Sequence, residues 1–132
     1  MERTRSKHLV LILARELAAN VATPMFLVDP DEVLVFFNEP AERLLGETFA
    51  STGETSVATW GRKHTPERLD GTPYPLSEFP LTTAMRARRP AHETFRFVSG
   101  DGIKREVTAA FYPLLAQSDE FAGAVGIFWE SA

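Results

Sequence analysis

The sequence contains no cysteine. This absence excludes disulfide bonds, iron–sulfur clusters, thiolate zinc sites, cysteine nucleophiles and flavin chemistry that proceeds through a cysteinyl adduct. Long apolar runs are absent too. The most hydrophobic stretch near the N-terminus, residues 9–14, is shorter than a signal-peptide core and far shorter than the ~20 residues that span a bilayer. We therefore expect a soluble, cytoplasmic protein without a membrane partner.

An excess of positive charge is also lacking. Lysine and arginine number 14 against 18 acidic residues, which gives a formal net charge of −4 at pH 7. Nucleic-acid-binding domains usually carry a basic face that neutralises phosphates. The basic cluster of Arg3, Arg5, Lys7 and His8 is diluted by neighbouring Glu2. The sequence therefore predicts no nucleic-acid partner.

Signatures of catalysis and of metal binding are missing as well. The sequence has no Gly-x-Ser-x-Gly elbow, and residues 100–102 are typical of a hairpin turn because no Gly-Lys-Ser/Thr follows them. His64, Glu67 and Asp70 match no metal-site spacing. We expect these three residues to lie in a solvated loop, with no metal and no catalytic residue in the chain.

The composition is that of one ordinary globular domain: 132 residues, of which 44% are hydrophobic and 24% charged. Its first 20 residues favour a helix, since Leu9, Ile12, Leu13 and Leu17 recur at three- and four-residue spacing on one face. Further apolar residues widen this face, namely Val10, Leu11 and Ala14. The extra width fits either packing against the domain or a subunit interface. We assign residues 1–20 to an amphipathic helix with a dimer contact, and residues 21–132 to the domain proper.

Short strands and helices follow. Asn38 caps a helix that ends at Gly46, whereas residues 47–78 favour loop with one or two helical turns. Ser77 caps a longer helix that reaches Arg89. The five predicted strands span residues 25–28, 33–37, 94–98, 103–115 and 121–130. This order predicts an α+β fold, in which one face of a five-stranded antiparallel sheet carries short helices and one longer helix.

Several stretches are informative as a set. They are MFLVDPD (25–31) with FNEPAERLLG (37–46), DGTPYPL (70–76) with Pro80-Leu81, and Asp101-Gly102 with REV (105–107), Pro113-Leu114 and GAV (123–125). Their order and spacing resemble the PAS sensor-domain family over about residues 18 to 130. The sequence departs from the family at Glu32, where a glycine is usual in the first hairpin turn. It also ends without the family's signalling helix, so we expect a free-standing domain or a fragment.

The resemblance implies a non-enzymatic domain for sensing and signal transduction. Such a domain would bind a small ligand in an internal apolar pocket, form a homodimer, or contact a signalling partner that the sequence does not identify. The expected pocket residues are Phe26, Val28, Leu34, Phe36, Leu81, Met85, Phe95, Phe97, Ala109, Phe111, Val125 and Ile127. The expected dimer contacts are Leu9, Ile12, Leu13, Leu17 and Trp129.

The cofactor and two alternative functions stay open at this point. Haem-binding members of the family place a histidine on or near the central helix, and residues 77–89 contain none, although His92 follows closely. A flavin held without a covalent bond, stacked on Trp60 or Trp129, or another small molecule is compatible with the sequence. One alternative function is an interaction module with a filled core. The other is a small enzyme of the ketosteroid-isomerase type, for which Asp29 is the candidate base, although a turn explains this residue better.

Overall fold

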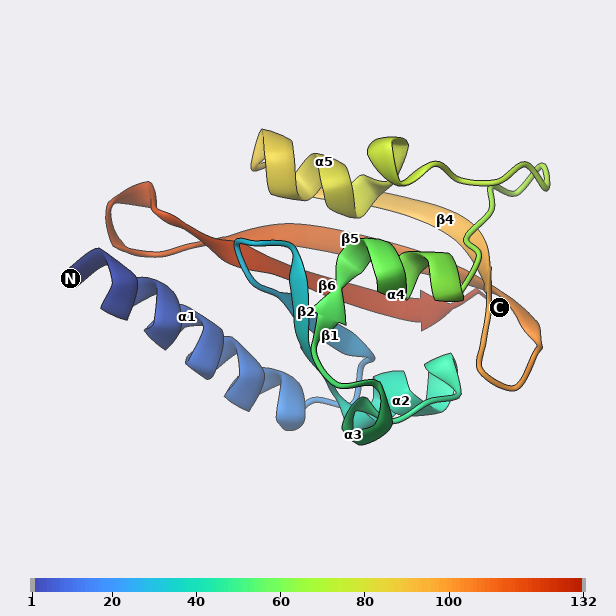
Figure 1. Cartoon of the computed structure of the whole chain (residues 1–132), viewed down its shortest axis with the longest axis horizontal. Coiled ribbons are helices and arrows are strands. Elements are labelled where there is room, and N and C mark those ends of the chain that lie inside the picture. The colour runs from blue at the N-terminus through green and yellow to red at the C-terminus, as the bar shows by residue number, and fades with distance from the viewer. Residues whose placement is uncertain (1, 132) are drawn as a thin grey trace.

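The computed structural model describes residues 2–131, with the side chains of residues 9–117 and 119–131 (Figure 1). The basic cluster at residues 3–8 therefore lies outside the described side chains. Helix α1 (Glu2–Ala19) opens the chain. No helix in the described part of the chain combines the length and apolar character needed to cross a bilayer.

The sheet is antiparallel throughout and has six strands in the order β3-β2-β1-β6-β5-β4. The strands are β1 (Met25–Val28), β2 (Val33–Phe37), β3 (Thr55–Ser56), β4 (Ala91–Val98), β5 (Lys104–Leu115) and β6 (Phe121–Glu130). The α+β class and the five predicted strands are confirmed. The sixth strand, β3, is a two-residue strand beside Val33 and Leu34, and two residues are too few to produce an alternating pattern.

Five short helical segments cover one face of the sheet, which we call the inner face (Figure 1). They are α2 (Glu39–Leu45), α3 (Phe49–Thr52), α4 (Val57–Lys63), the 3₁₀ turn η1 (Leu76–Glu78) and α5 (Pro80–Ala87). The helix predicted from Ser77 is shorter than expected. Its N-cap is Phe79 rather than Ser77, because Pro80 occupies the first helical position, and Arg88 ends it in the left-handed conformation.

The first hairpin turn keeps a left-handed residue although glycine is absent. Glu32 has φ +61°, a conformation that costs most side chains energy. The Asp29 carboxylate holds this turn by accepting the backbone N–H groups of Asp31 (2.9 Å) and Val33 (3.0 Å). Asp29 is thus a turn residue, as the sequence indicated.

Asn38 joins three elements and is itself buried. Its Oδ1 accepts the N–H of Ala41 at the start of α2 (3.1 Å) and that of Met25 in β1 (3.0 Å). Its Nδ2 donates to the carbonyls of Ala18 and Thr23, both at 2.9 Å. The residue predicted as a helix cap therefore also connects the end of α1 to the hairpin through its hydrogen bonds.

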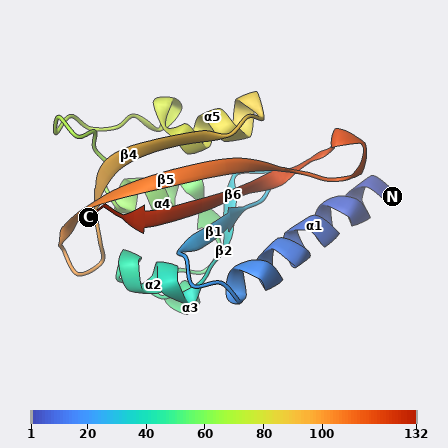
Figure 2. The same ribbon diagram turned by 180° about the vertical axis from the view of Figure 1, so that it is seen from behind.

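Helix α1 lies on the outer face of the sheet against β1, β5 and β6 (Figure 2). Ala18 is fully buried, and Val10, Leu11 and Ala14 are half-buried. The remaining large apolar side chains of α1 are exposed by 55–60%, namely Leu9, Ile12, Leu13 and Leu17. The two apolar sets of the predicted helix therefore have different surroundings. Within the described part of the chain, no contact buries the set of Leu9, Ile12, Leu13 and Leu17.

Candidate functional site

An apolar cavity lies between the inner face of the sheet and the helices. Its volume is about 80 Å³. Six of the twelve predicted pocket residues line it, namely Phe26, Leu81, Phe95, Phe97, Ala109 and Phe111. Phe26 can lie across β6 because Gly126 has no side chain: a methyl group there would come within 2.3 Å of the ring.

The other six predicted residues do not line the cavity, and the strand pleat or a register shift explains three of them. Val28, Leu34 and Met85 are buried in the same core but away from the cavity. Val125 and Ile127 alternate with the inward residues Ala124 and Phe128 and so are on the outer face. On β2 the inward residues are Leu34 and Phe37, because the pairing with β1 shifts register between Leu27 and Val28. That shift leaves Phe36 half-buried outside the core cluster.

Further lining residues were not predicted. Most come from the segment that was expected to be loop, and they are Leu45, Val57, Trp60, Gly61, His64, Pro66, Leu76, Phe79, Val107 and Phe128. Trp60 packs edge-on against Phe26 with ring centroids 5.1 Å apart, and it stacks on Phe37. Trp60 and His64 are four residues apart, which places them on one face of a helix. That spacing was the available signal, and it needed a predicted helix at residues 57–63.

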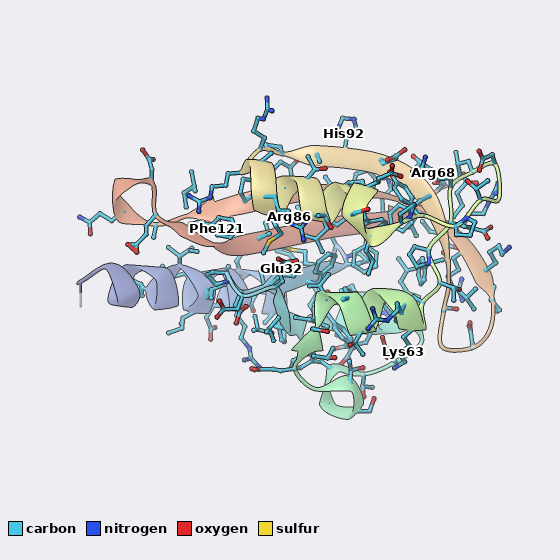
Figure 3. The ribbon with its side chains drawn as sticks, turned by 45° about the horizontal axis from the view of Figure 1, so that its top comes forward. Glu32, Lys63, Arg68, Arg86, His92 and Phe121 are labelled. Carbon is cyan, nitrogen blue, oxygen red and sulfur yellow. The ribbon has the colours of Figure 1, made fainter. Side chains whose placement is uncertain are left out.

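A buried polar cluster borders the cavity at α4. The carboxylate of Glu47, on the turn after α2, accepts four hydrogen bonds. Its Oε1 is 3.0 Å from Trp60 Nε1 and 2.7 Å from His64 Nε2. Its Oε2 is 2.5 Å from Lys63 Nζ and 2.9 Å from Thr52 Oγ1. Figure 3 shows Lys63 at the end of α4. One carboxylate thus fixes α3 and α4 to the turn after α2.

The surroundings of Glu47 keep it ionised. Burial raises the pKa of a carboxyl group, but the hydrogen bonds from Lys63, His64, Trp60 and Thr52 outweigh burial and lower the pKa of Glu47 to about 2. The side chain of Glu47 is 7% exposed and that of His64 is 8% exposed. A fixed negative charge that is surrounded by donors therefore lies behind the cavity wall, in contact with the wall residues Trp60 and His64.

His64 is not in a solvated loop, which corrects the prediction. It caps the C-terminal end of α4, and its Nδ1 lies 2.9 Å from the carbonyl oxygen of Val98 in β4. The two acidic residues considered with it are elsewhere: Glu67 pairs with Lys104 at 2.9 Å, and Asp70 accepts hydrogen bonds from Thr72. Among the described side chains, no three His, Asp or Glu residues come together as a metal site.

A second polar contact holds the segment between α4 and η1. Tyr74 donates a hydrogen bond to Glu93 on β4, and the Arg68 guanidinium lies 4.6 Å from the centre of its ring (Figure 3). Burial and Glu93 together raise the pKa of Tyr74 to about 12. Tyr74 is therefore neutral near pH 7 and serves as a donor that fastens this segment to the sheet.

The cavity does not fit a flavin. Pockets for drug-sized ligands have volumes of about 300–1,000 Å³, several times the volume found here. The flavin ring also needs hydrogen-bonding partners, and both nitrogens of the one polar side chain in the wall, His64, already have partners. Trp129, the other proposed stacking residue, is 45% exposed and does not line the cavity.

The lining suits a small apolar molecule instead. An engineered apolar cavity of about 150 Å³ binds benzene or xenon, so a cavity of about 80 Å³ has room for a few heavy atoms. Asp29, the candidate base of the cone-fold alternative, does not line it. The arrangement can therefore bind a small apolar ligand, and no acid or base from the hairpin turn reaches it.

Comparison with solved structures finds PAS and LOV domains among the neighbours. The PAS domain of a Colwellia psychrerythraea protein is 15% identical with a TM-score of 0.65, over 92% of this chain and 97% of that one. The PAS domain of Bordetella pertussis BvgS is 16% identical with a TM-score of 0.62, over 92% and 85%. The LOV domain of a blue-light-activated histidine kinase from Erythrobacter litoralis is 19% identical with a TM-score of 0.67, over 86% and 99%. No protein-family model and no curated protein match the sequence.

Proposed function

Because this chain has the fold of PAS domains, we propose that it is a non-enzymatic sensory domain that binds a small apolar ligand in the cavity of the inner face. The observation that carries this proposal is the cavity itself: about 80 Å³ of space, lined almost entirely by aromatic and aliphatic side chains, within an otherwise packed core. Protein interiors rarely leave such space unfilled. The cysteine-free sequence fits a cytoplasmic location.

A signal requires that the ligand bind two packing states unequally. Strands β1 and β6 connect the cavity to the outer face, since their residues alternate between the two sides. Phe26 and Phe128 line the cavity, while Leu27 is buried on the outer face where α1 lies. A ligand that displaces the aromatic side chains would therefore change the surface on which α1 packs.

A second copy of the chain is the proposed partner of the outer face. The exposed apolar side of α1 presents Leu9, Ile12, Leu13 and Leu17 as one stripe, and Trp129 is exposed at the end of β6. Exposed apolar patches of this kind mark interaction surfaces. A homodimer through α1 would bury the stripe and place the ligand-sensitive sheet beside the interface. A further signalling partner could then bind near this interface.

The test uses two leucine substitutions on the same strand. Ala109 lines the cavity, whereas Ala110 is its neighbour on the outer face. Xenon is dissolved at increasing pressure in solutions of the full chain, and its binding is followed by amide chemical shifts. We expect saturable shifts at cavity residues in the wild type and in Ala110→Leu, and their loss in Ala109→Leu, where the new side chain fills the space. Absence of saturable shifts in the wild type would instead favour the alternative of an interaction module whose core takes no ligand.

A further inference from the structure

The cluster at α4 contains a histidine that only acceptors surround. His64 Nε2 lies 2.7 Å from Glu47 Oε1, and His64 Nδ1 lies 2.9 Å from the carbonyl oxygen of Val98. A backbone carbonyl can only accept a hydrogen bond, and an ionised carboxylate can only accept as well. Glu47 is ionised here, since three other donors from Trp60, Lys63 and Thr52 already point at its two oxygens.

Counting hydrogens then fixes the state of the ring. A neutral imidazole carries one N–H and leaves a lone pair on the other nitrogen, whereas an imidazolium carries two N–H groups. In the neutral state, the unprotonated ring nitrogen would point its lone pair at an acceptor oxygen. The side chain of His64 is about nine-tenths buried. An uncompensated buried contact of this kind is unfavourable. The geometry is thus complete only with both ring nitrogens protonated.

The other charged groups near His64 come from three elements. Lys63, its neighbour on α4, binds the far oxygen of Glu47. Val98 also lines a groove together with Arg62 of α4, Glu67 and Lys104 of β5. Glu67 and Lys104 form an ion pair. Inside, His64 meets only rings: its centroid is 5.9 Å from that of Trp60 and 5.7 Å from that of Phe97. Among these described groups, Glu47 is the counter-charge in direct contact with the ring.

His64 is also placed where a local change would reach the cavity. Its ring forms part of the wall, and its backbone carbonyl accepts the N–H of Val98 at 2.9 Å. The next residue, Thr65, has φ +42°, a left-handed conformation that is strained for a β-branched side chain and is held only by its surroundings. Release of His64 would free the strained end of α4 and the segment that closes the cavity.

We propose that the Glu47–His64 pair is a proton-dependent latch on the cavity, closed while His64 carries two protons and released when it loses one. Sensing of pH by this latch goes beyond ligand binding, although its effect on ligand uptake rests on the proposed function. The direction follows from the contacts: a rise in pH removes the second ring proton, breaks one of the two contacts and loosens α4. A fall in pH keeps the latch closed until Glu47 itself is protonated.

The first measurement reads the protons directly. The full chain is labelled with ¹⁵N, and long-range ¹H–¹⁵N spectra distinguish the imidazolium ring from the two neutral tautomers. At about pH 7 we expect both nitrogens of His64 to be protonated, because each of them faces an acceptor. Glu47→Gln should abolish this state, whereas Glu39→Gln, at an exposed glutamate of α2, should leave it unchanged. A wild-type His64 with a single ring proton at that pH would overturn the proposal, whether or not any variant folds.

The second measurement reads the cavity wall. In a Trp129→Phe background, Trp60 is the remaining tryptophan, and its quenching by acrylamide reports how open the wall is. Across the pH range in which the ¹⁵N spectra show His64 losing one ring proton, we expect quenching to increase about twofold or more. His64→Gln should remove this dependence. His92→Gln should retain it, because His92 is exposed on the edge strand β4 (Figure 3).

Two outcomes separate the latch from the proposed function. If xenon binds equally well above and below the pH at which His64 loses a ring proton while quenching stays constant, the latch is overturned and the proposed function stands. If His64 shows both protons and quenching rises with pH but xenon never binds, the latch is supported and the proposed ligand function fails.

Discussion

Glu47 shows how one buried side chain can order a region that the sequence described as loop. Its carboxylate accepts bonds from the α3 residue Thr52 and from three residues on α4 and at its end. A buried charge is stabilising only when its partners compensate the loss of water. The partners of Glu47 provide this compensation, because four donors bind its two carboxylate oxygens. The position of α4, and with it Trp60 and His64, depends on this residue.

We predict that Glu47→Gln lowers the free energy of unfolding by about 2–3 kcal/mol near neutral pH. The ordinary pKa of this carboxyl is 4.5 and the folded-state pKa is lowered to about 2. The contribution is therefore fully present above about pH 4.5 and is lost as the pH falls through about 2. Urea unfolding at several pH values should show the wild type and the variant converging in acid. The control is Glu39→Gln, at an exposed glutamate whose pair with Arg43 on the helix surface contributes little; equal losses in both variants would contradict this account.

Glu32 gives a prediction of the opposite sign. Its φ of +61° is unfavourable for a residue with a side chain, and glycine adopts it freely. We expect Glu32→Gly to raise the free energy of unfolding by about 0.5–1 kcal/mol. Glu54→Gly, at a glutamate without a positive φ, should lower it. Thermal unfolding compares the two variants, and a destabilised Glu32→Gly would show that the turn is not strained.

At the scale of elements, Asn38 fixes three of them in one place. It caps α2, accepts a hydrogen bond from β1, and donates to the carbonyls of Ala18 in α1 and of Thr23 just after it. We predict that Asn38→Ala lowers the free energy of unfolding by about 3 kcal/mol or more, because it leaves several buried partners without a hydrogen bond.

The matched control is Ser56→Ala, which removes an N-cap whose single exposed hydrogen bond serves one helix, α4. That change should cost about 1 kcal/mol. Chemical denaturation of both variants gives the comparison. A loss for Asn38→Ala no greater than that for Ser56→Ala would mean that the bonds to α1 and β1 contribute nothing.

The elements differed in how well the sequence predicted them. The hairpin at residues 25–37, the Asn38 cap and the last strands carry local signals such as alternation, capping residues and turn residues, and they were predicted within a few residues. The helical turns expected within residues 47–78 could not be placed, because α4 is only seven residues long and its stability comes from Glu47, ten or more residues away. No local pattern reports a contact of that kind.

Contacts between residues far apart in the sequence also limited the prediction of the site residues. Half of the predicted pocket residues line the cavity, five of them on strands whose period places them inward. A register shift and the choice of face explain Phe36, Val125 and Ile127, whereas Val28 and Leu34 point inward but lie away from the cavity. Phe36 and Phe37 are adjacent phenylalanines, and the sequence does not say which one points inward. His64 was expected in solvent, since Glu47 is not its neighbour in sequence.

At the scale of the whole molecule, the two faces of the sheet have different partners. The inner face carries the cavity and the outer face carries α1, whose exposed stripe is the proposed dimer contact. Light scattering should give a mass of twice 14.7 kDa for the wild type. The double variant Leu13→Glu/Leu17→Glu should give a monomer.

Leu69→Glu serves as the control, since Leu69 is also exposed but lies in the segment between α4 and η1. This variant should remain a dimer. A wild-type monomer at micromolar concentration would refute the proposed interface, as would a double variant that keeps the dimer mass.

The central claim is that the inner face encloses an apolar cavity that a small ligand can enter. The most direct measurement is a crystal structure of the chain under xenon pressure, because xenon is a single apolar atom that enters dry apolar cavities. The account predicts a xenon atom bounded by Phe26, Trp60 and Phe111, and its absence in Ala109→Leu. Density that shows these side chains filling the space, with no xenon bound in the wild type, would contradict it.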